Sequence, residues 1–364
     1  MPSCARKTVV DQDEVGVYHV WGRCVRRAWL CGDDPVSGNN YDYRRDWICK
    51  NEEAFAALFA IDIGFHVEMC NHLHLVLRTR PDVVAGWSDE EVVRRVLTIN
   101  NRTRNLAGEL ELPAENEILV ALNDRESVAE YRLRLSSPSW FMKALRENIA
   151  RRSNQEDSCS GVFWDGRFKC RRLLDETAIL ICGIYVDLNQ IRAGETQSPE
   201  ESTHTSAFDR IAGRDARQAA AAVALSDDER EQRAPDGWLG ELTLDERQAA
   251  DPNASLHSRT GRRASDKGLI PVSLDRYLEL LDWTGRAIRS DKAGAIPEHL
   301  APILERLQIR SDRWIDLVTN FDRWFGSFAG HVDRLATFAA GIGRKLFRGL
   351  NPLSSAFMHS TSGP

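Results

Sequence analysis

The feature that most constrains the fold is a pair of adjacent strand-like runs, residues 65–70 and 72–79. Successive side chains of a strand point to opposite faces, so residues two apart share a face. One face of the second run is apolar and consists of Leu73, Leu75 and Leu77. The other face consists of His72, His74 and Val76. We therefore expect a strand in a sheet, with its leucines toward a core and its histidines away from that core.

The two histidines of this strand are the first candidate for a chemical site. His72 and His74 are two residues apart, so both imidazole rings point to the same side and can reach one metal ion. The alternative is a pair of solvent-facing histidines on an edge strand. The spacing by itself leaves both interpretations open.

A second candidate lies in the apolar segment around Tyr185. Asp175 as N-cap and Gly194 as C-terminal stop predict a helix over residues 176–192. Tyr185 and Asn189 are four residues apart and share one face of it. A phenol is a poor nucleophile at its usual pKa of about 10. It becomes competent when a metal polarises the electrophile and a nearby group takes the proton. The alternative is a tyrosine of the hydrophobic core.

The other elements are predicted from periodicity and capping residues. Residues 15–25 alternate in the manner of a strand. Asn51, followed by Glu52 and Glu53, predicts the start of a helix that ends at Gly64. Two further helices are predicted from their amphipathic periodicity, over residues 88–106 and 139–153.

A basic segment stands out in a chain whose net charge is −6. Residues 143–172 have four acidic residues against eight basic ones, which are Lys143, Arg146, Arg151, Arg152, Arg167, Lys169, Arg171 and Arg172. A local basic surface of this kind is typical of nucleic-acid binding. The alternative is an ordinary set of solvated helix faces.

The eight cysteines and the absence of long apolar runs bear on the compartment. No two cysteines form a Cys-x-x-Cys pair, so we expect reduced thiols in a cytosolic protein rather than a zinc ribbon. No run of 18 apolar residues occurs, so no transmembrane helix is predicted. The first residues lack the apolar core of a secretory signal. We expect a cytoplasmic, nucleoid-associated protein without a membrane partner.

The amino-acid composition changes near residue 200, where polar residues become dominant. We predict a first domain over residues 1–200, a linker and polar helical region over 201–270, and a helical domain of unknown role over 271–364. The first domain mixes strands and helices, which places it in the α+β class.

Four strings in the first domain resemble one family. They are VYHVWGRCVRRA, NHLHLVL, FWDGRFK and YVDLNQIRAG, in that order. Over roughly residues 13–208 the chain resembles the HUH single-tyrosine transposases, close to the REP-associated tyrosine transposase branch. The resemblance implies a ferredoxin-like fold, an antiparallel sheet with helices on one face.

The resemblance also implies a site and an activity. It makes His72 and His74 ligands of Mg²⁺ or Mn²⁺, Asn189 the third ligand, and Tyr185 a nucleophile that joins covalently to a DNA 5′ end. The expected substrate is single-stranded DNA with hairpin structure, and a homodimer is a further expectation. The predicted DNA contacts are Arg151, Arg152, Trp164, Arg167, Phe168, Lys169, Arg171 and Arg172.

One position departs from the family pattern. The family helix usually has Asn-Pro where this chain has Asn189 and Gln190. Because Asn189 itself is retained, we expect the change to be tolerated. Gln190 is the less favoured metal ligand, since it points about 100° away from Asn189 on a helix.

Two other classes of function remain open from the sequence. One is a non-cleaving protein that still binds nucleic-acid hairpins. The other is a metallohydrolase that uses the His-x-His pair to activate water, which calls for a further cluster of ligands. Asp62 and Glu68 are near in sequence but have no ligand spacing.

Overall fold

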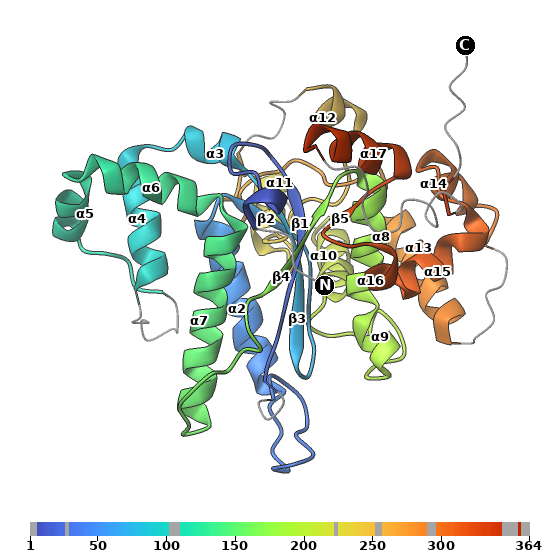
Figure 1. Ribbon diagram of the computed structural model, residues 1–364, viewed down its shortest axis with the longest axis horizontal. Helices are drawn as coiled ribbons and strands as arrows, with labels where there is room; N and C mark the ends of the chain where they lie inside the picture. Colours follow the sequence, from blue (N-terminus) through green and yellow to red (C-terminus); the bar gives the residue numbers. More distant parts are fainter. Residues whose placement is uncertain are drawn as a thin grey trace.

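The computed structural model describes residues 6–25, 29–101, 110–221, 225–251, 257–289, 296–343 and 356–357. At its centre is a five-stranded sheet with the order β2-β3-β1-β4-β5 (Figure 1). The first four strands in that order pair antiparallel, and β5 adds to β4 in parallel. The strands are β1 (Val17–Arg23), β2 (Ile61–Glu68), β3 (His72–Thr79), β4 (Lys169–Leu173) and β5 (Phe328–Ala329).

The hairpin of β2 and β3 has the alternation that the sequence predicts. Leu73, Leu75 and Leu77 belong to one hydrophobic cluster, while Val76 belongs to another cluster on the opposite face. The register between the two strands shifts between Ile63 and Phe65. Because one extra residue reverses every side chain that follows it, Phe65 and Val67 join the cluster of Val76.

Helices cover both faces of the sheet. On one side lie α2 (Tyr43–Leu58) and α7 (Pro138–Glu156), and on the other lies α8 (Glu176–Asp187), as Figure 1 shows. The predicted α+β class is confirmed. The expectation of helices on one face only is corrected: each face has its own apolar cluster, and an apolar sheet face must be covered.

The side of α2 and α7 is completed by a group of shorter helices. They are α3 (Pro81–Ala85), α4 (Asp89–Asn100), α5 (Glu115–Leu122) and α6 (Arg125–Leu135). The prediction of a helix over residues 139–153 is confirmed by α7. The helix predicted over residues 88–106 is α4, which ends at Asn100, and residues 102–109 lie outside the described residues.

The boundaries predicted for the second helix are wrong. It begins at Tyr43 rather than at Asn51, which is buried in the middle of the helix. It ends at Leu58, because residues 61–68 pair with β3 as a strand. Tertiary pairing here overrides the local capping signal. Glu52, expected in the first turn, lies in the middle of α2 and is fully buried.

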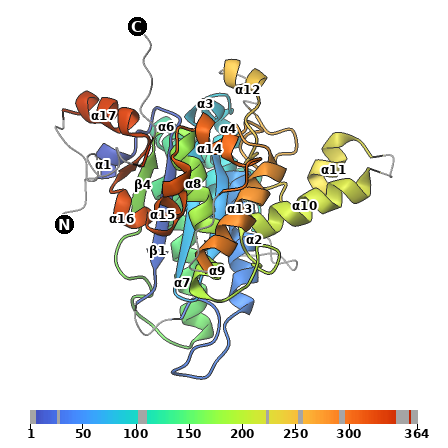
Figure 2. The same cartoon turned by 90° about the vertical axis from the view of Figure 1, so that its right-hand side faces the viewer.

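The remaining helices, apart from α1, follow α8 in the chain. They are α1 (Arg6–Val9), α9 (Asn189–Ala193), α10 (Ser206–Ala220), α11 (Asp227–Arg233), α12 (Glu246–Ala250), α13 (Leu274–Arg289), α14 (Ala301–Arg306), the 3₁₀ helix η1 (Ser311–Arg313), α15 (Trp314–Thr319), α16 (Phe321–Trp324) and α17 (Val332–Gly341). Figure 2 shows α10 and α11 extending away on one side, with α16 and α17 on the other.

The chain beyond residue 200 shares a core with α8. One hydrophobic cluster contains Tyr185, Leu242 and Trp314, which come from the three segments that the sequence predicts as separate regions. Asp187 of α8 also accepts hydrogen bonds from the hydroxyl groups of Ser206 and Tyr277. The division into 1–200, 201–270 and 271–364 stays a prediction.

Candidate active site

The α8 face of the sheet brings four aromatic side chains together from β1 and β3. Trp21 pairs across the strands with His74, and His19 lies two residues before Trp21. His19 stacks on Trp21 with ring centroids 4.6 Å apart. His72 lies next to His74, with centroids 5.0 Å apart. Strand alternation therefore assembles the predicted histidine pair and adds a third histidine to it.

Tyr185 lies over this group because α8 approaches the sheet closely. A Cβ atom at Gly183 would come within 2.5 Å of the Phe65 ring of β2, so glycine allows the helix to lie this near. Asp175 caps the helix by accepting from Ala178 N at 2.8 Å, which confirms the predicted start. The Tyr185 ring centroid lies 5.8 Å from that of His74 and 6.0 Å from that of His19.

Each histidine of the predicted pair has one ring nitrogen fixed by a neighbour. His72 Nδ1 lies 2.7 Å from Asn71 Oδ1, and His74 Nδ1 lies 2.8 Å from His19 Nε2. Within the part of the chain that the structure describes, neither Nε2 atom has a hydrogen-bond partner. A histidine that binds a metal through one nitrogen has the other nitrogen held in this way. The pair therefore fits a metal ion.

The pair does not by itself complete a coordination shell. Among the described residues, no third His, Cys, Asp or Glu joins His72 and His74 in a group whose ligand atoms all lie within 4.8 Å of one another. A water molecule, a substrate phosphate oxygen or the Asn189 carbonyl oxygen must supply the remaining positions.

Burial keeps the three histidines of this face neutral. It lowers the pKa of His72 to about 4, with a further contribution from the positive charge of Arg23. It also lowers the pKa of His74 and of His19 well below the usual value. A neutral imidazole has the lone pair that a metal ion needs. These side chains are therefore ready to act as ligands at neutral pH.

Residues near the C-terminal end of the described chain cover the tyrosine. The Tyr185 hydroxyl donates to Asp322 Oδ2 at 3.1 Å, and the Phe321 ring centroid lies 5.3 Å from that of Tyr185. The Arg192 guanidinium lies 4.8 Å from the same ring centroid. Burial, with the charge of Asp322, raises the pKa of Tyr185 to about 12. A phenol in this setting needs a base to become a nucleophile.

Asn189 lies one turn after Tyr185, as the sequence predicts. Its side-chain nitrogen donates to Tyr185 O at 3.1 Å, which turns the carbonyl oxygen away from that part of the helix. Gln190 has a different role, because its side-chain nitrogen donates to Thr203 O at 2.8 Å. Gln190 is thus tied to the loop before α10, and the assignment of Asn189 as third ligand stays a prediction.

Four of the predicted DNA contacts are exposed side chains, Arg151, Arg152, Arg167 and Lys169. Lys169 pairs across the strands with Trp21, which places it on the α8 face near the tyrosine. Arg172 is half-buried and forms an ion pair with Glu14 at 3.2 Å. These positions are compatible with contacts to phosphate groups.

Three of the predicted DNA contacts are largely buried. Trp164 and Phe168 are 8% and 7% exposed, and both line an open hollow beside α7, so their roles as stacking residues stay predictions. The Trp164 indole N–H donates to Arg146 O at 2.8 Å. Arg171 is turned inward and donates to Gly326 O, Phe325 O and Asp322, so its guanidinium is held by the fold.

Several residues of the site were not predicted from the sequence. The alternation of residues 15–25 could have placed His19 and Trp21 on one face, since they are two residues apart. Asp322 and Phe321 gave no local signal, because Asp322 is 137 residues from Tyr185 in the chain.

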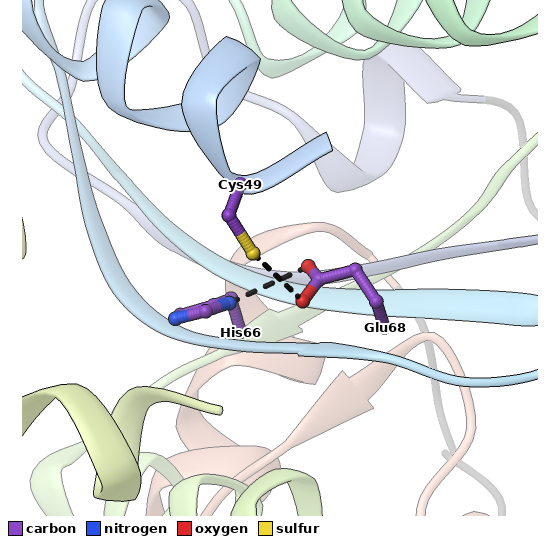
Figure 3. Close-up of side chains that lie close together, drawn as sticks. All are labelled: Cys49, His66 and Glu68. Atoms are coloured by element: carbon purple, nitrogen blue, oxygen red, sulfur yellow. Dashed lines mark hydrogen bonds and ion pairs between the residues drawn. The ribbon is translucent and has the colours of Figure 1, made fainter. Parts of the chain in front are cut away.

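A second group of side chains could hold a metal ion, on the face of the sheet that α2 covers. Cys49, His66 and Glu68 have ligand atoms within 4.8 Å of one another (Figure 3). The spacing of Glu68 in the sequence gives no sign of a ligand, because its partner Cys49 comes from another element of the fold. All seven cysteines among the described residues, Cys49 included, are free thiols, and Cys4 lies outside them.

Comparison with known proteins gave no match. No protein-family model matches the chain, no curated protein matches it in sequence, and no solved structure matches it in fold. Of the helices that the structure describes, none combines the length and apolar character needed to cross a bilayer. The function is therefore inferred from the arrangement of the side chains.

Proposed function

We propose that this protein nicks and rejoins single-stranded DNA through a covalent 5′-phosphotyrosine at Tyr185. The observation that supports the proposal best is the position of the Tyr185 ring, 5.8 Å from the His74 ring centroid and on the same sheet face as His72. Nucleophilic attack by a phenol requires a polarised phosphate beside it. The nucleophile and the ligand pair are 113 residues apart, taking Tyr185 and His72, so the fold has to bring them together.

Asp322 is the group that takes the phenolic proton in this proposal. Its carboxylate lies 3.1 Å from the Tyr185 hydroxyl, within the distance required of a general base. The phenolic oxygen forms a bond to phosphorus, the bond from phosphorus to the 3′ oxygen breaks, and that oxygen leaves as a 3′-OH after taking a proton. Attack by a 3′-OH on the phosphotyrosine reverses these steps. His72 and His74 would hold a Mg²⁺ or Mn²⁺ ion, which would supply polarisation of the phosphate.

The substrate has to be single-stranded, because the tyrosine is largely covered. Tyr185 is 7% exposed, and Phe321 of the four-residue helix α16 lies against its ring. A phosphate group reaches the hydroxyl only when α16 moves aside. Trp21, half-buried beside His19, offers a ring for base stacking, and the exposed Lys169 offers a phosphate contact.

The test is covalent capture of labelled DNA. The full chain is incubated with Mn²⁺ and a panel of single-stranded hairpins, and the products are separated on a denaturing gel. We expect a protein–DNA adduct with wild type and none with Tyr185→Phe. Tyr131→Phe, on the polar helix α6, is the matched control and should retain the adduct. Absence of an adduct across the panel, or an adduct with Tyr185→Phe, refutes the proposal.

A second candidate is a protein that binds hairpin DNA without cutting it. The burial of Tyr185 under Phe321 and its hydrogen bond to Asp322 favour this candidate, because a tyrosine that does not attack DNA can remain covered. The same experiment separates the two. Hairpin retention in a native gel without adduct formation supports the binding protein. For both candidates, the proposed partner is the DNA of the nucleoid in the cytoplasm.

A further inference from the structure

The α2 face of β2 has a buried polar cluster that the proposed DNA chemistry does not use. His66 and Glu68 are two residues apart on the strand and face α2. Cys49 and Glu52, about one turn apart on α2, face them. His66, Glu68 and Glu52 are each 0% exposed. Figure 3 shows the Cys49 thiol, the His66 ring and the Glu68 carboxylate pointing toward one another.

The distances within the cluster place several ligand atoms around one point. His66 Nδ1 lies 3.4 Å from Glu68 Oε1 and 3.7 Å from Glu52 Oε2. Cys49 Sγ lies 3.2 Å from Glu68 Oε2. The Cys49 thiol, the His66 imidazole and the Glu68 carboxylate lie within 4.8 Å of one another and give three donors. The Glu52 carboxylate lies beside His66 but outside that group, and it has to shift toward the other three to complete a four-coordinate shell.

Glu52 is the side chain that an ordinary hydrogen-bond network leaves unexplained. Among the described residues, no group donates a hydrogen bond to either of its carboxylate oxygens, although both are buried, and only a protonated Glu52 can bond to Glu68. A buried carboxyl group without partners is costly, and such groups are rare. Burial and the charge of Glu68 raise the pKa of Glu52 well above its usual value. A cation between the two carboxylates would remove this cost.

The other nitrogen of His66 is held in the way that metal-binding histidines require. His66 Nε2 lies 3.2 Å from Asp209 Oδ2 of α10. This carboxylate keeps a proton on Nε2, so Nδ1 becomes the metal-binding nitrogen once a bound ion displaces the proton that it shares with Glu68. The His66 ring centroid also lies 5.0 Å from that of Trp238, which holds the imidazole in place.

We propose that Cys49, Glu52, His66 and Glu68 bind one divalent transition-metal ion of the Zn²⁺ type, at a site separate from the His72–His74 pair. A thiolate with an imidazole selects zinc-like ions over Mg²⁺ and Ca²⁺. Binding displaces the protons of the Cys49 thiol, the Glu52 carboxyl group and any on His66 Nδ1. The ion joins α2 to the edge strand β2, so its role is to stabilise the fold.

Cobalt substitution tests this site without reference to DNA cleavage. The full chain is stripped with a chelator and titrated with Co²⁺, whose thiolate complexes show a charge-transfer band and whose tetrahedral complexes show strong visible bands. We expect both bands to saturate at one equivalent, and Zn²⁺ to displace them. Cys49→Ser should abolish the thiolate band, and Glu52→Gln should weaken binding at least tenfold.

Two controls keep the result specific. The His72→Ala, His74→Ala double variant should keep both bands, because the ion lies on the other face of the sheet. Cys159→Ser removes an exposed thiol and should also leave them unchanged. Asp209→Asn should weaken binding by roughly 10–100-fold, as loss of an outer partner does.

The proposal is overturned by any of three results. First, the absence of a thiolate charge-transfer band in wild type titrated with Co²⁺ refutes the site. Second, a band that persists in Cys49→Ser places the ion elsewhere. Third, the site is refuted if Zn²⁺ does not raise the melting temperature of stripped wild type. This measurement needs no variant, so it also applies when circular dichroism shows that a variant is poorly folded.

Discussion

His74 and His66 belong to neighbouring strands of one hairpin, and they lie on opposite faces of the sheet. Both are buried, at 3% and 0% exposure, yet their surroundings differ. His74 is surrounded by aromatic rings and by two other histidines. His66 lies between the carboxylates of Glu68 and Asp209. The same residue type is thus placed in two distinct electrostatic settings.

The difference shows that burial alone does not decide the charge of a histidine. Desolvation lowers the pKa of His74 well below its usual value. The same desolvation acts on His66, but the charges of Glu68 and Asp209 outweigh it and raise the pKa well above that value. The α8 face therefore offers neutral nitrogen ligands beside a phenol, which suits phosphate chemistry. The α2 face offers charged groups that suit a tightly held ion.

The largest expected effect is on the rate of adduct formation, which should depend on the histidines of the α8 face. His74→Ala should slow adduct formation about 10³-fold, because loss of metal polarisation removes several kcal/mol of transition-state stabilisation. The measurement is the initial rate of adduct formation with Mn²⁺ on a denaturing gel. His299→Ala, at an exposed position, should retain the wild-type rate. An unchanged rate in His74→Ala would show that the α8 face is not the reaction centre.

The next largest effect is on the free energy of unfolding at acid pH, measured in the presence of a chelator. The pKa of His72 is about 4 in the folded chain, against 6.5 for a free histidine. A depressed folded-state pKa gives stability that is present above pH 6.5 and lost as the pH falls toward about 4. The shift corresponds to about 3 kcal/mol. Urea unfolding across this range should show a smaller loss for His72→Gln than for wild type.

His66 should act in the opposite direction in the same experiment. Its folded-state pKa is raised by Glu68 and Asp209, against desolvation. The stability it contributes is therefore complete below the usual pKa and is lost as the pH rises. Glu52, whose pKa is also raised, adds to this trend. If His72→Gln and wild type have parallel pH profiles, the electrostatic contrast between the two faces is wrong.

The sequence predicted those parts of the site that depend on local periodicity. His72 and His74 share a face because they are two residues apart on a strand, and Tyr185 and Asn189 share a face because they are one helical turn apart. Asp175 and Gly194 mark the two ends of the region correctly, since capping is a local interaction. The single helix predicted between them is interrupted at Leu188, where α8 ends and α9 begins.

Contacts between distant segments could not be predicted in this way. Asp322 reaches Tyr185 across 137 residues, and no local pattern indicates that contact. Asn51 resembles a helix cap, so the local pattern predicts Glu52 in the first turn of a helix. The helix in fact begins eight residues earlier, at Tyr43, and this turns Glu52 into the core beside His66. The whole second cluster was missed for that reason.

A smaller effect is expected at Asp322, which tests how the α8 face activates its phenol. Asp322→Asn keeps the shape of the side chain but cannot take a proton, so adduct formation should slow about 10²-fold. The rate of the variant should continue to rise with pH where that of wild type levels off, since hydroxide replaces the base. A purely structural role would lower the rate without changing the pH profile. A rate equal to that of wild type would remove Asp322 from the mechanism.

The smallest effect concerns two neighbouring cations of β4 on this face. Lys169 is exposed, whereas Arg171 is 3% exposed and donates to Gly326 O at 2.6 Å. Binding of single-stranded DNA is measured by anisotropy as a function of salt. Lys169→Gln should reduce the slope of log affinity against log salt by about 0.7, because one phosphate contact is lost. Arg171→Gln should leave the slope unchanged and lower stability instead, by about 1–3 kcal/mol, since its buried acceptors lose their donors. Equal slopes for the two variants would mean that Arg171 leaves the interior to contact DNA, and that the cover over Tyr185 opens when DNA binds.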